Sequence, residues 1–312
     1  MFDFFDMHCD TATEIFNNKA ELLTNNLNIS LDKSDEIAKY VQTFAFWTKN
    51  DEDVTVNRFN AFTECYSYFM KQCIKNSERV MIISDKDDLK KSTDNNKRGI
   101  ILAIEGGGVI EGKIERLEKL RKNGIKLLTV TWNLKNELSG GILDEVESGI
   151  TETGKEAVSE MERLGIIPDV SHISDKGFED MCAIAKKPFV ATHSNSRSEC
   201  RHKRNLTDDM FKEIVKRGGI VGINLYAKFL NDSEIAEDKD IVRHIDRFLK
   251  LGGEDTVVFG TDFDGVDNKL PKGIKTLKDV NKLVTLLMEN YGKETAEKIL
   301  YKNAYSFFEK QL

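Results

Sequence analysis

Short β-like runs alternate with longer helical patterns along the whole of this 312-residue chain. In the helical patterns, apolar residues recur at three- and four-residue spacing, which is the helical period. We expect eight strands, at residues 2–8, 41–47, 99–105, 126–132, 167–172, 189–193, 220–226 and 256–262. We expect helices at residues 58–75, 113–122, 155–164, 176–185, 208–217, 236–251, 277–290 and 293–310.

This alternation predicts an α/β protein, folded as one (β/α)8 barrel of the TIM type in which eight parallel strands close into a cylinder. A doubly wound sheet with a second domain would explain the same pattern less economically. No Gly/Ser-rich or low-complexity stretch interrupts the chain, which contains only three prolines. We therefore expect a single barrel domain over residues 1–312.

Composition narrows the classes of partner and the compartment. Lysine and arginine number 46 against 53 acidic residues, a net charge of −7, and no basic block is present. This argues against nucleic acid, whose phosphates attract clustered basic residues. No apolar run reaches the roughly 18 residues of a membrane span, and the N-terminus lacks the pattern of a secretion signal. Five cysteines without CxxC spacing suit reduced thiols. These features predict a cytoplasmic protein without a membrane partner.

Residues of the kinds that bind metal ions stand at the ends of several expected strands. They are His8 and Asp10 at the first strand, Glu105 at the third, His172 at the fifth, His193 at the sixth and Asp262 at the eighth. In a parallel barrel all carboxyl ends lie at one rim, where such folds build their active sites. In extended chain, residues i and i+2 point to the same side. We therefore expect these side chains to converge.

Imidazole and carboxylate groups are zinc-type ligands, and a carboxylate can bridge two ions through its two oxygens. Glu105 is the natural bridge. Two ions roughly 3.5–4 Å apart would turn a shared water into hydroxide near neutral pH and polarise a substrate carbonyl. Asp262, outside the ligand set, could take the proton of that water and return it to a leaving amine.

Each of these assignments has a structural alternative. Asp10 could be a helix N-cap. Glu105, which precedes three glycines, could belong to a plain turn, although a buried unpaired carboxylate costs several kcal/mol. One of Asp262 and Asp264 could simply cap a turn. The other two histidines are expected to be surface residues or hydrogen-bonded core groups rather than ligands. His202 falls in a polar loop, and His244 falls on a helix that faces either solvent or the barrel wall.

Taken together, the strand ends resemble the membrane dipeptidase (renal dipeptidase-like, M19) family of zinc peptidases. The matching segments run in order from residue 6 to residue 265. They are DMHCD at 6–10, IEGG at 104–107, DVSHIS at 169–174, KPFVATHSNSR at 187–197, RNLT at 204–207, GIVGIN at 219–224 and GTDFDG at 260–265. The resemblance implies a (β/α)8 barrel and a zinc-dependent dipeptidase that hydrolyses the peptide bond by a metal-bridged hydroxide. Many similar enzymes accept a D-residue on the C-terminal side of the dipeptide.

The resemblance also implies roles for individual residues. Two Zn²⁺ ions per chain would be held, one by His8 and Asp10, the other by His172 and His193, with Glu105 as the bridge between them. Asp262 looks like the catalytic acid/base of the family. Arg204 occupies the position that would hold the C-terminal carboxylate of the substrate, a task that suits a bidentate guanidinium. Similar proteins are often homodimers.

The chain departs from the family at one position. Similar enzymes commonly have Thr-His-Asn after the fourth strand, whereas this chain has Thr131-Trp132-Asn133. The resemblance assigns Trp132 and Asn133 to substrate binding, yet the only polar atom of a Trp side chain is a donor N–H. Losing one oxyanion donor typically costs about 10²–10³ in turnover. A slow dipeptidase, a related binuclear-metal hydrolase of another amide or a lactone, and a non-catalytic peptide-binding member are therefore the alternatives.

Overall fold

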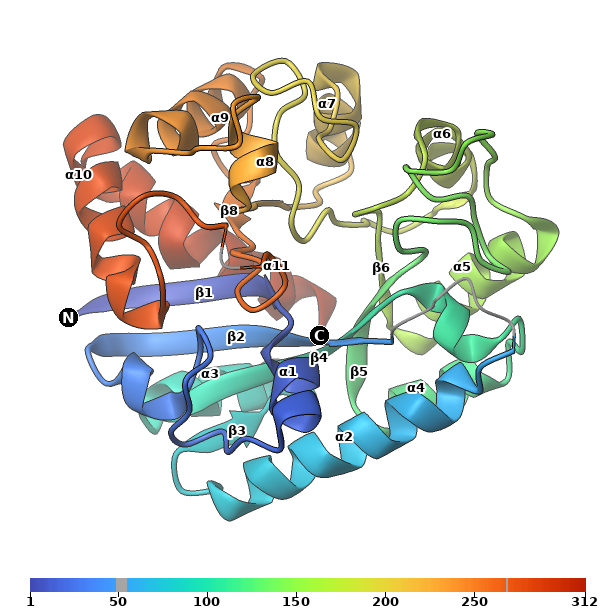
Figure 1. Cartoon of the computed structure of the whole chain (residues 1–312), viewed down its shortest axis with the longest axis horizontal. Coiled ribbons are helices and arrows are strands. Elements are labelled where there is room, and N and C mark those ends of the chain that lie inside the picture. Colours follow the sequence, from blue (N-terminus) through green and yellow to red (C-terminus); the bar gives the residue numbers. More distant parts are fainter. Residues whose placement is uncertain (49–54, 268) are drawn as a thin grey trace.

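The computed structural model describes residues 1–48, 55–267 and 269–312. It has an α/β fold built on a curved sheet of eight strands, all paired in parallel (Figure 1). The strands are β1 (Phe2–Cys9), β2 (Ile37–Trp47), β3 (Val80–Ile82), β4 (Arg98–Glu105), β5 (Ile125–Thr129), β6 (Ile167–Asp169), β7 (Val221–Ile223) and β8 (Val257–Phe259). Their order is β6-β5-β4-β2-β1-β8-β7, and β3 pairs only with β4.

Helices follow most of the strands, and none in the described part of the chain is long and apolar enough to cross a membrane. They are α1 (Thr11–Asn18), α2 (Arg58–Lys75), α3 (Lys86–Asp94), α4 (Arg116–Lys122), α5 (Glu152–Leu164), α6 (Asp175–Ile184), α7 (Asp208–Lys216), α8 (Ala227–Leu230), α9 (Asp238–Lys250), α10 (Val280–Glu297) and α11 (Asn303–Gln311). Thr151, Ser174 and Thr207 cap α5, α6 and α7 by accepting a backbone N–H with their hydroxyl oxygens. Such caps satisfy amide groups that have no partner within the helix.

The expected α/β fold with a parallel sheet is confirmed, whereas closure of that sheet into an eight-stranded barrel is not. Residues 189–193, expected as the sixth strand, form no regular strand. Val190 bridges to Asp169 of β6, and Ala191 bridges to Val221 of β7. Backbone hydrogen bonds accompany both bridges, including Val170 N to Val190 O at 2.8 Å. The named strands thus leave one position between β6 and β7, and this segment occupies it.

The sequence pattern missed one strand and three α-helices and overestimated other elements. The short strand β3 and the helices α1, α3 and α8 were not expected. The expected strands 167–172 and 256–262 end early, at Asp169 and Phe259. Neither strand could have reached its expected end, because His172 (φ 70°) and Asp262 (φ 62°) adopt the left-handed conformation, which does not continue a strand.

Side chains alternate between two hydrophobic layers along the strands, as the period of two requires. Phe4 packs in the outer layer beneath the helices, whereas Phe5 belongs to an inner cluster that also contains Val41, Leu127 and Val258 from other strands. The C-terminal residues Tyr301, Ala304, Phe307 and Phe308 complete this inner cluster. Apolar side chains thus fill the space enclosed by the curved sheet, so polar residues that could bind a ligand are expected at its rims.

Candidate metal centre

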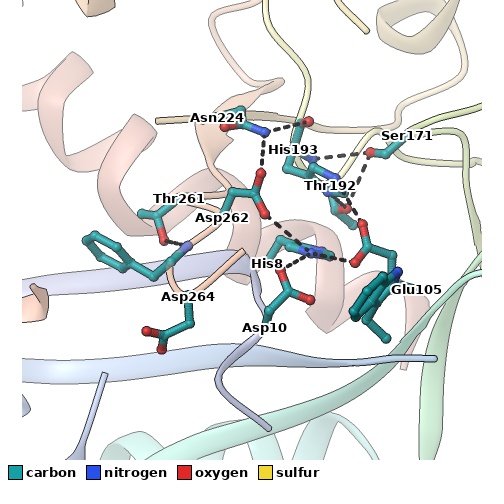
Figure 2. A network of polar contacts seen from close by, with 12 residues as sticks. His8, Asp10, Glu105, Ser171, Thr192, His193, Asn224, Thr261, Asp262 and Asp264 are labelled. Atoms are coloured by element: carbon teal, nitrogen blue, oxygen red, sulfur yellow. Dashed lines mark hydrogen bonds and ion pairs between the residues drawn. The ribbon is translucent and has the colours of Figure 1, made fainter. Parts of the chain in front are cut away.

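The predicted metal-type side chains meet at the carboxyl ends of the strands (Figure 2). His8 is the last but one residue of β1, and Glu105 is the last residue of β4. His172 follows β6 by three residues, and Asp262 follows β8 by three. His193 ends the bridged segment between β6 and β7. This rim is where parallel α/β folds place their active sites.

One group of possible ligands surrounds His8. Its Nε2 lies 3.6 Å from Asp10 Oδ2 and 3.7 Å from Glu105 Oε2. Asp10 occupies the N-cap position of α1, the structural alternative considered for it, but its side chain makes no capping hydrogen bond. The carboxylate is turned toward His8 instead. His8, Asp10 and Glu105 thus present ligand atoms within 4.8 Å of one another.

A second group meets the other oxygen of the same glutamate. Glu105 Oε1 lies 2.8 Å from His172 Nε2 and 3.4 Å from His193 Nε2. Glu105 therefore directs Oε2 toward one group and Oε1 toward the other. This is the geometry that a carboxylate bridging two ions requires.

These residues fit divalent metal ions on the evidence of their unsatisfied atoms. His8 Nε2 and Asp10 Oδ1 are buried without a hydrogen-bond partner among the residues described. His172 donates its Nδ1–H to Asn133 Oδ1 over 2.9 Å, which leaves its Nε2 as a lone pair aimed at the site. Buried polar atoms without a partner are costly, and a cation would satisfy them. A set of imidazole nitrogens and carboxylate oxygens is typical of zinc.

The negative charges of the buried carboxylates also favour a cation between the two ligand groups. Burial alone would lower the pKa of His8, but the carboxylates of Glu105 and Asp10 outweigh it and raise that pKa well above its usual value. Burial alone would raise the pKa of Glu105, but the positive charge of His8 opposes it, and that pKa lies well below its usual value. Glu105 is therefore an ionised carboxylate.

Asp262 stands next to this centre. Its Oδ1 lies 3.8 Å from His8 Nε2, and its Oδ2 accepts a hydrogen bond of 2.8 Å from Asn224 Nδ2. Burial raises its pKa, and the charge of His8 offsets part of that rise. Gly265 packs so closely that a Cβ there would collide with Asp10 Oδ2 and Asp262 Oδ1. A glycine is therefore required beside the two carboxylates, a role that the sequence pattern did not reveal.

Asp264, the alternative to Asp262, is turned away from the centre (Figure 2). Its Oδ2 accepts from Thr11 Oγ1 over 2.5 Å, and its Oδ1 accepts from the backbone N–H of Asn28 over 2.6 Å. Both oxygens therefore join the loop after β8 to the start of the chain. The structure gives Asp264 the turn-stabilising role and leaves Asp262 facing the candidate ligands.

A cavity of about 420 Å³ opens onto the centre. Trp132 and Asn133 line it, and so do Trp47, Tyr226 and Phe229, which were not predicted. The rings of Trp47 and Trp132 lie 5.2 Å apart, so that they form one aromatic wall. Trp47 is the last residue of β2. The strand-end rule that found the ligands would have found Trp47, had it been applied to aromatic residues.

Arg204 lies deeper than expected for a group that meets substrate. It is 4% exposed, and it lines a narrow pocket with His172 rather than the larger cavity. Its Nη2 donates to His193 O over 3.4 Å, while its Nε is buried without a partner among the described residues. Burial lowers its pKa to about 10. A buried guanidinium with such incomplete bonding is suited to receiving an anion.

Comparison with known proteins shows what the chain is similar to. Residues 1–311 match the membrane dipeptidase family, peptidase family M19. A protein of Klebsiella pneumoniae, known as the uncharacterized protein in the pqqA 5′ region, is 31% identical over 247 residues, 75% of this chain and 90% of that protein. An uncharacterized dipeptidase of Schizosaccharomyces pombe is 30% identical over 224 residues, which cover 69% of this chain but only 52% of the yeast protein.

The fold is also similar to solved structures. One is a metallopeptidase from Rhodobacter sphaeroides, liganded with a phosphinate mimic of the dipeptide L-Ala-D-Ala. It superposes with a TM-score of 0.91 over 100% of this chain and 99% of its own, at 22% sequence identity. At that identity the likeness concerns the fold.

Proposed function

The chain belongs to the membrane dipeptidase family, peptidase family M19, and from this premise we propose that it is a zinc-dependent dipeptidase. The proposed reaction is hydrolysis of the peptide bond of a dipeptide, including one whose C-terminal residue has the D configuration. The bound L-Ala-D-Ala mimic in the Rhodobacter sphaeroides metallopeptidase supports this substrate class. The family is one of metallopeptidases, so the activity is that of a hydrolase.

The observation that carries the proposal is the division of Glu105 between two groups of ligands, with Oε2 toward His8 and Oε1 toward His172 and His193. In the proposal, His8 and Asp10 hold one zinc ion, and His172 and His193 hold the other. When bound, such a pair supplies Lewis acidity, which acidifies a water molecule and polarises the scissile carbonyl.

The proton transfers are assigned to Asp262. Its Oδ1 faces the centre, while Asn224 holds Oδ2 and so fixes the plane of the carboxylate. Asp262 accepts a proton from the attacking water and passes it to the nitrogen of the leaving amino acid as the C–N bond breaks. The proton therefore ends on the amine, and the water oxygen ends in the new carboxylate.

The remaining residues bind the substrate. We propose that Arg204 receives the C-terminal carboxylate, because its guanidinium is buried beside the centre with an unused Nε. Trp132 forms a wall of the cavity against which a side chain can pack. Asn133 contacts His172 Nδ1, so its first task is to orient that imidazole.

We also propose that residues 1–312 act as one domain and that residues 189–193 close the sheet into a (β/α)8 barrel. The bridges from Val190 to β6 and from Ala191 to β7 support this closure. The homodimer expected from similar proteins is a further proposal, which light scattering of the purified protein tests.

Metal analysis combined with a substrate panel tests the function. The purified protein should contain about two zinc ions per chain and hydrolyse L-Ala-D-Ala, L-Ala-L-Ala or both. Chelation should abolish hydrolysis, and added Zn²⁺ should restore it. A matched panel of N-acetyl amino acids, cyclic amides and lactones separates the dipeptidase from a related hydrolase. Absence of metal after reconstitution would overturn the proposal, as would hydrolysis confined to the second panel.

A further inference from the structure

Two buried aspartates make the same unusual contact with a threonine of the neighbouring segment. Asp169 Oδ1 accepts from the Thr192 backbone N–H over 3.0 Å, and its Oδ2 accepts from Thr192 Oγ1 over 2.6 Å. Asp6 accepts from the N–H and Oγ1–H of Thr261 over 2.8 and 2.6 Å. Each threonine directly precedes a residue of the centre, His193 or Asp262. We call each of these pairs an Asp–Thr clamp.

The clamp at Thr192 has an additional contact. Thr192 Oγ1 lies 2.8 Å from His193 Nδ1 (Figure 2). A carboxylate only accepts hydrogen bonds, so the short contact to Asp169 takes the proton of the Thr192 hydroxyl. The oxygen of Thr192 is then left as an acceptor for His193, whose Nδ1 must carry the hydrogen. The lone pair of His193 is consequently on Nε2, which faces Glu105 and His172.

We infer that Asp169 and Thr192 are positioning residues, which fix the tautomer and the ring orientation of His193 so that its Nε2 is available to a metal ion. The inference rests on the proposed function. Contacts of this kind behind a metal-binding histidine typically contribute 10–100-fold in metal affinity. Asp169 is 1% exposed and Thr192 is also 1% exposed, so water does not compete for these hydrogen bonds.

The same carboxylate supplies a matched control. Thr129 Oγ1 donates to Asp169 Oδ2 over 2.8 Å, and Thr129 is 2% exposed. Thr129→Val and Thr192→Val therefore remove the same group from the same oxygen, at sites of equal burial. Only Thr192 contacts the imidazole. A merely structural role for the aspartate network would make the two variants equivalent.

The test measures Zn²⁺ affinity of the full chain by competition with a chelator, together with the visible absorption of the Co²⁺-substituted protein. Thr192→Val should weaken one of the two metal sites by about 10–100-fold and alter the Co²⁺ spectrum. Thr129→Val should leave both readouts within a few-fold of wild type, and Thr192→Ser, which keeps the hydroxyl, should restore them. Equal losses in both valine variants, or no loss in Thr192→Val, would overturn the inference.

A measurement on the wild-type chain keeps the inference falsifiable if Thr192→Val does not fold. Long-range ¹H–¹⁵N spectra of the Zn²⁺-loaded protein should show His193 protonated at Nδ1 and bound through Nε2. Protonation at Nε2 in a chain that binds two metals would refute the assignment while leaving the proposed function intact. A wild-type chain that binds no metal would instead refute the proposed function.

Discussion

His172 Nε2 and His193 Nε2 lie 2.8 Å apart in the interior of the protein. Asn133 holds the Nδ1 proton of the first ring, and Thr192 holds that of the second, so both facing nitrogens carry lone pairs. Two lone pairs at this separation repel one another unless a cation lies between or beside them. A cation bound at this pair would therefore relieve an electrostatic repulsion.

Replacing the shared carboxylate should remove both metals. Glu105→Ala deletes the carboxylate whose two oxygens face the two ligand groups, so zinc content should fall from about two ions per chain toward none. Elemental analysis after gel filtration measures this. Glu118→Ala, on the exposed side of α4, is the control and should keep the full content. Retention of one tightly bound ion in Glu105→Ala would argue against bridging.

Substituting the two aspartates after β8 one at a time should distinguish a loss of catalysis from a loss of stability. Asp262→Asn should keep both metals and lose at least about 10² in kcat, since general acid–base catalysis typically contributes 10²–10⁴. Asp264→Asn should keep most of the activity per folded molecule but lower the unfolding free energy, because its oxygens bind Thr11 and Asn28. Steady-state kinetics and denaturant unfolding of both variants check this. Full turnover in Asp262→Asn would show that Asp262 is not the acid/base and would move that role to Asp264.

Arg197 and Arg204, two of the three arginines in the loop after residue 193, differ in what occupies their guanidinium groups. Arg197 is already bonded to both oxygens of Asp175, at 2.6 and 2.8 Å, whereas Arg204 has an unused Nε. Arg204→Ala should raise KM for dipeptides with a free carboxylate by about 10–10², the loss expected for a charged hydrogen bond. It should leave KM for amidated dipeptides nearly unchanged.

Arg197→Ala serves as the control for this prediction, and its effect on KM should be the same for both substrate types. An equal rise in KM for free and amidated dipeptides in Arg204→Ala would show that Arg204 does not bind the carboxylate.

Restoring the family residue at position 132 should increase dipeptide hydrolysis. Trp132→His supplies a side chain that can donate to a developing oxyanion, and one such donor is typically worth about 10²–10³ in kcat. Trp47→His alters the same aromatic wall at a position where no donor is expected. Its kcat should not rise. An unchanged kcat in Trp132→His would indicate that the tryptophan suits the natural substrate of this chain.

His244 should make the stability of the protein depend on pH. Its Nδ1 accepts from the backbone N–H of Ser196 over 3.0 Å, and its Nε2 donates to Leu230 O over 3.1 Å. Its pKa is lowered from 6.5 to about 4, chiefly by burial and to a smaller extent by Arg243, while the hydrogen bond to Leu230 and the charges of Asp240 and Asp232 partly oppose the shift. The unfolded chain therefore binds a proton, between pH 6.5 and 4, that the folded chain does not bind. The contribution of His244 to the unfolding free energy is fully present above pH 6.5 and is lost as the pH falls from 6.5 to about 4.

The two pKa values of His244 correspond to about 3 kcal/mol of unfolding free energy. His244→Gln removes the titrating group, so the loss between pH 7 and pH 4 should be smaller in the variant by roughly that amount. Urea unfolding at several pH values measures it, and the difference between the two proteins cancels the titration of other groups. Parallel pH profiles would show that His244 does not titrate as described.

His244 also shows what periodicity leaves open. The helical pattern placed it correctly on a helix, α9, but left open whether its side chain faces solvent or the barrel wall. Only the packed structure shows that it holds Ser196, in the loop that continues from His193 to Arg204. The clamps of Asp6 and Asp169 are of the same kind, because they join residues far apart in the chain and leave no periodic trace in it.

The sequence by itself determined the α/β class and placed His8, Glu105, His172 and His193 at one rim. It could do so because parallel strands separated by helices all end on the same side. Tertiary structure alone decided that Asp262 faces the centre while Asp264 turns away, that Arg204 is buried, and that Trp47 shares the cavity. Side-chain direction at a strand end is set by the φ and ψ angles where the chain leaves the sheet and by the neighbours met there, and neither is fixed by local sequence.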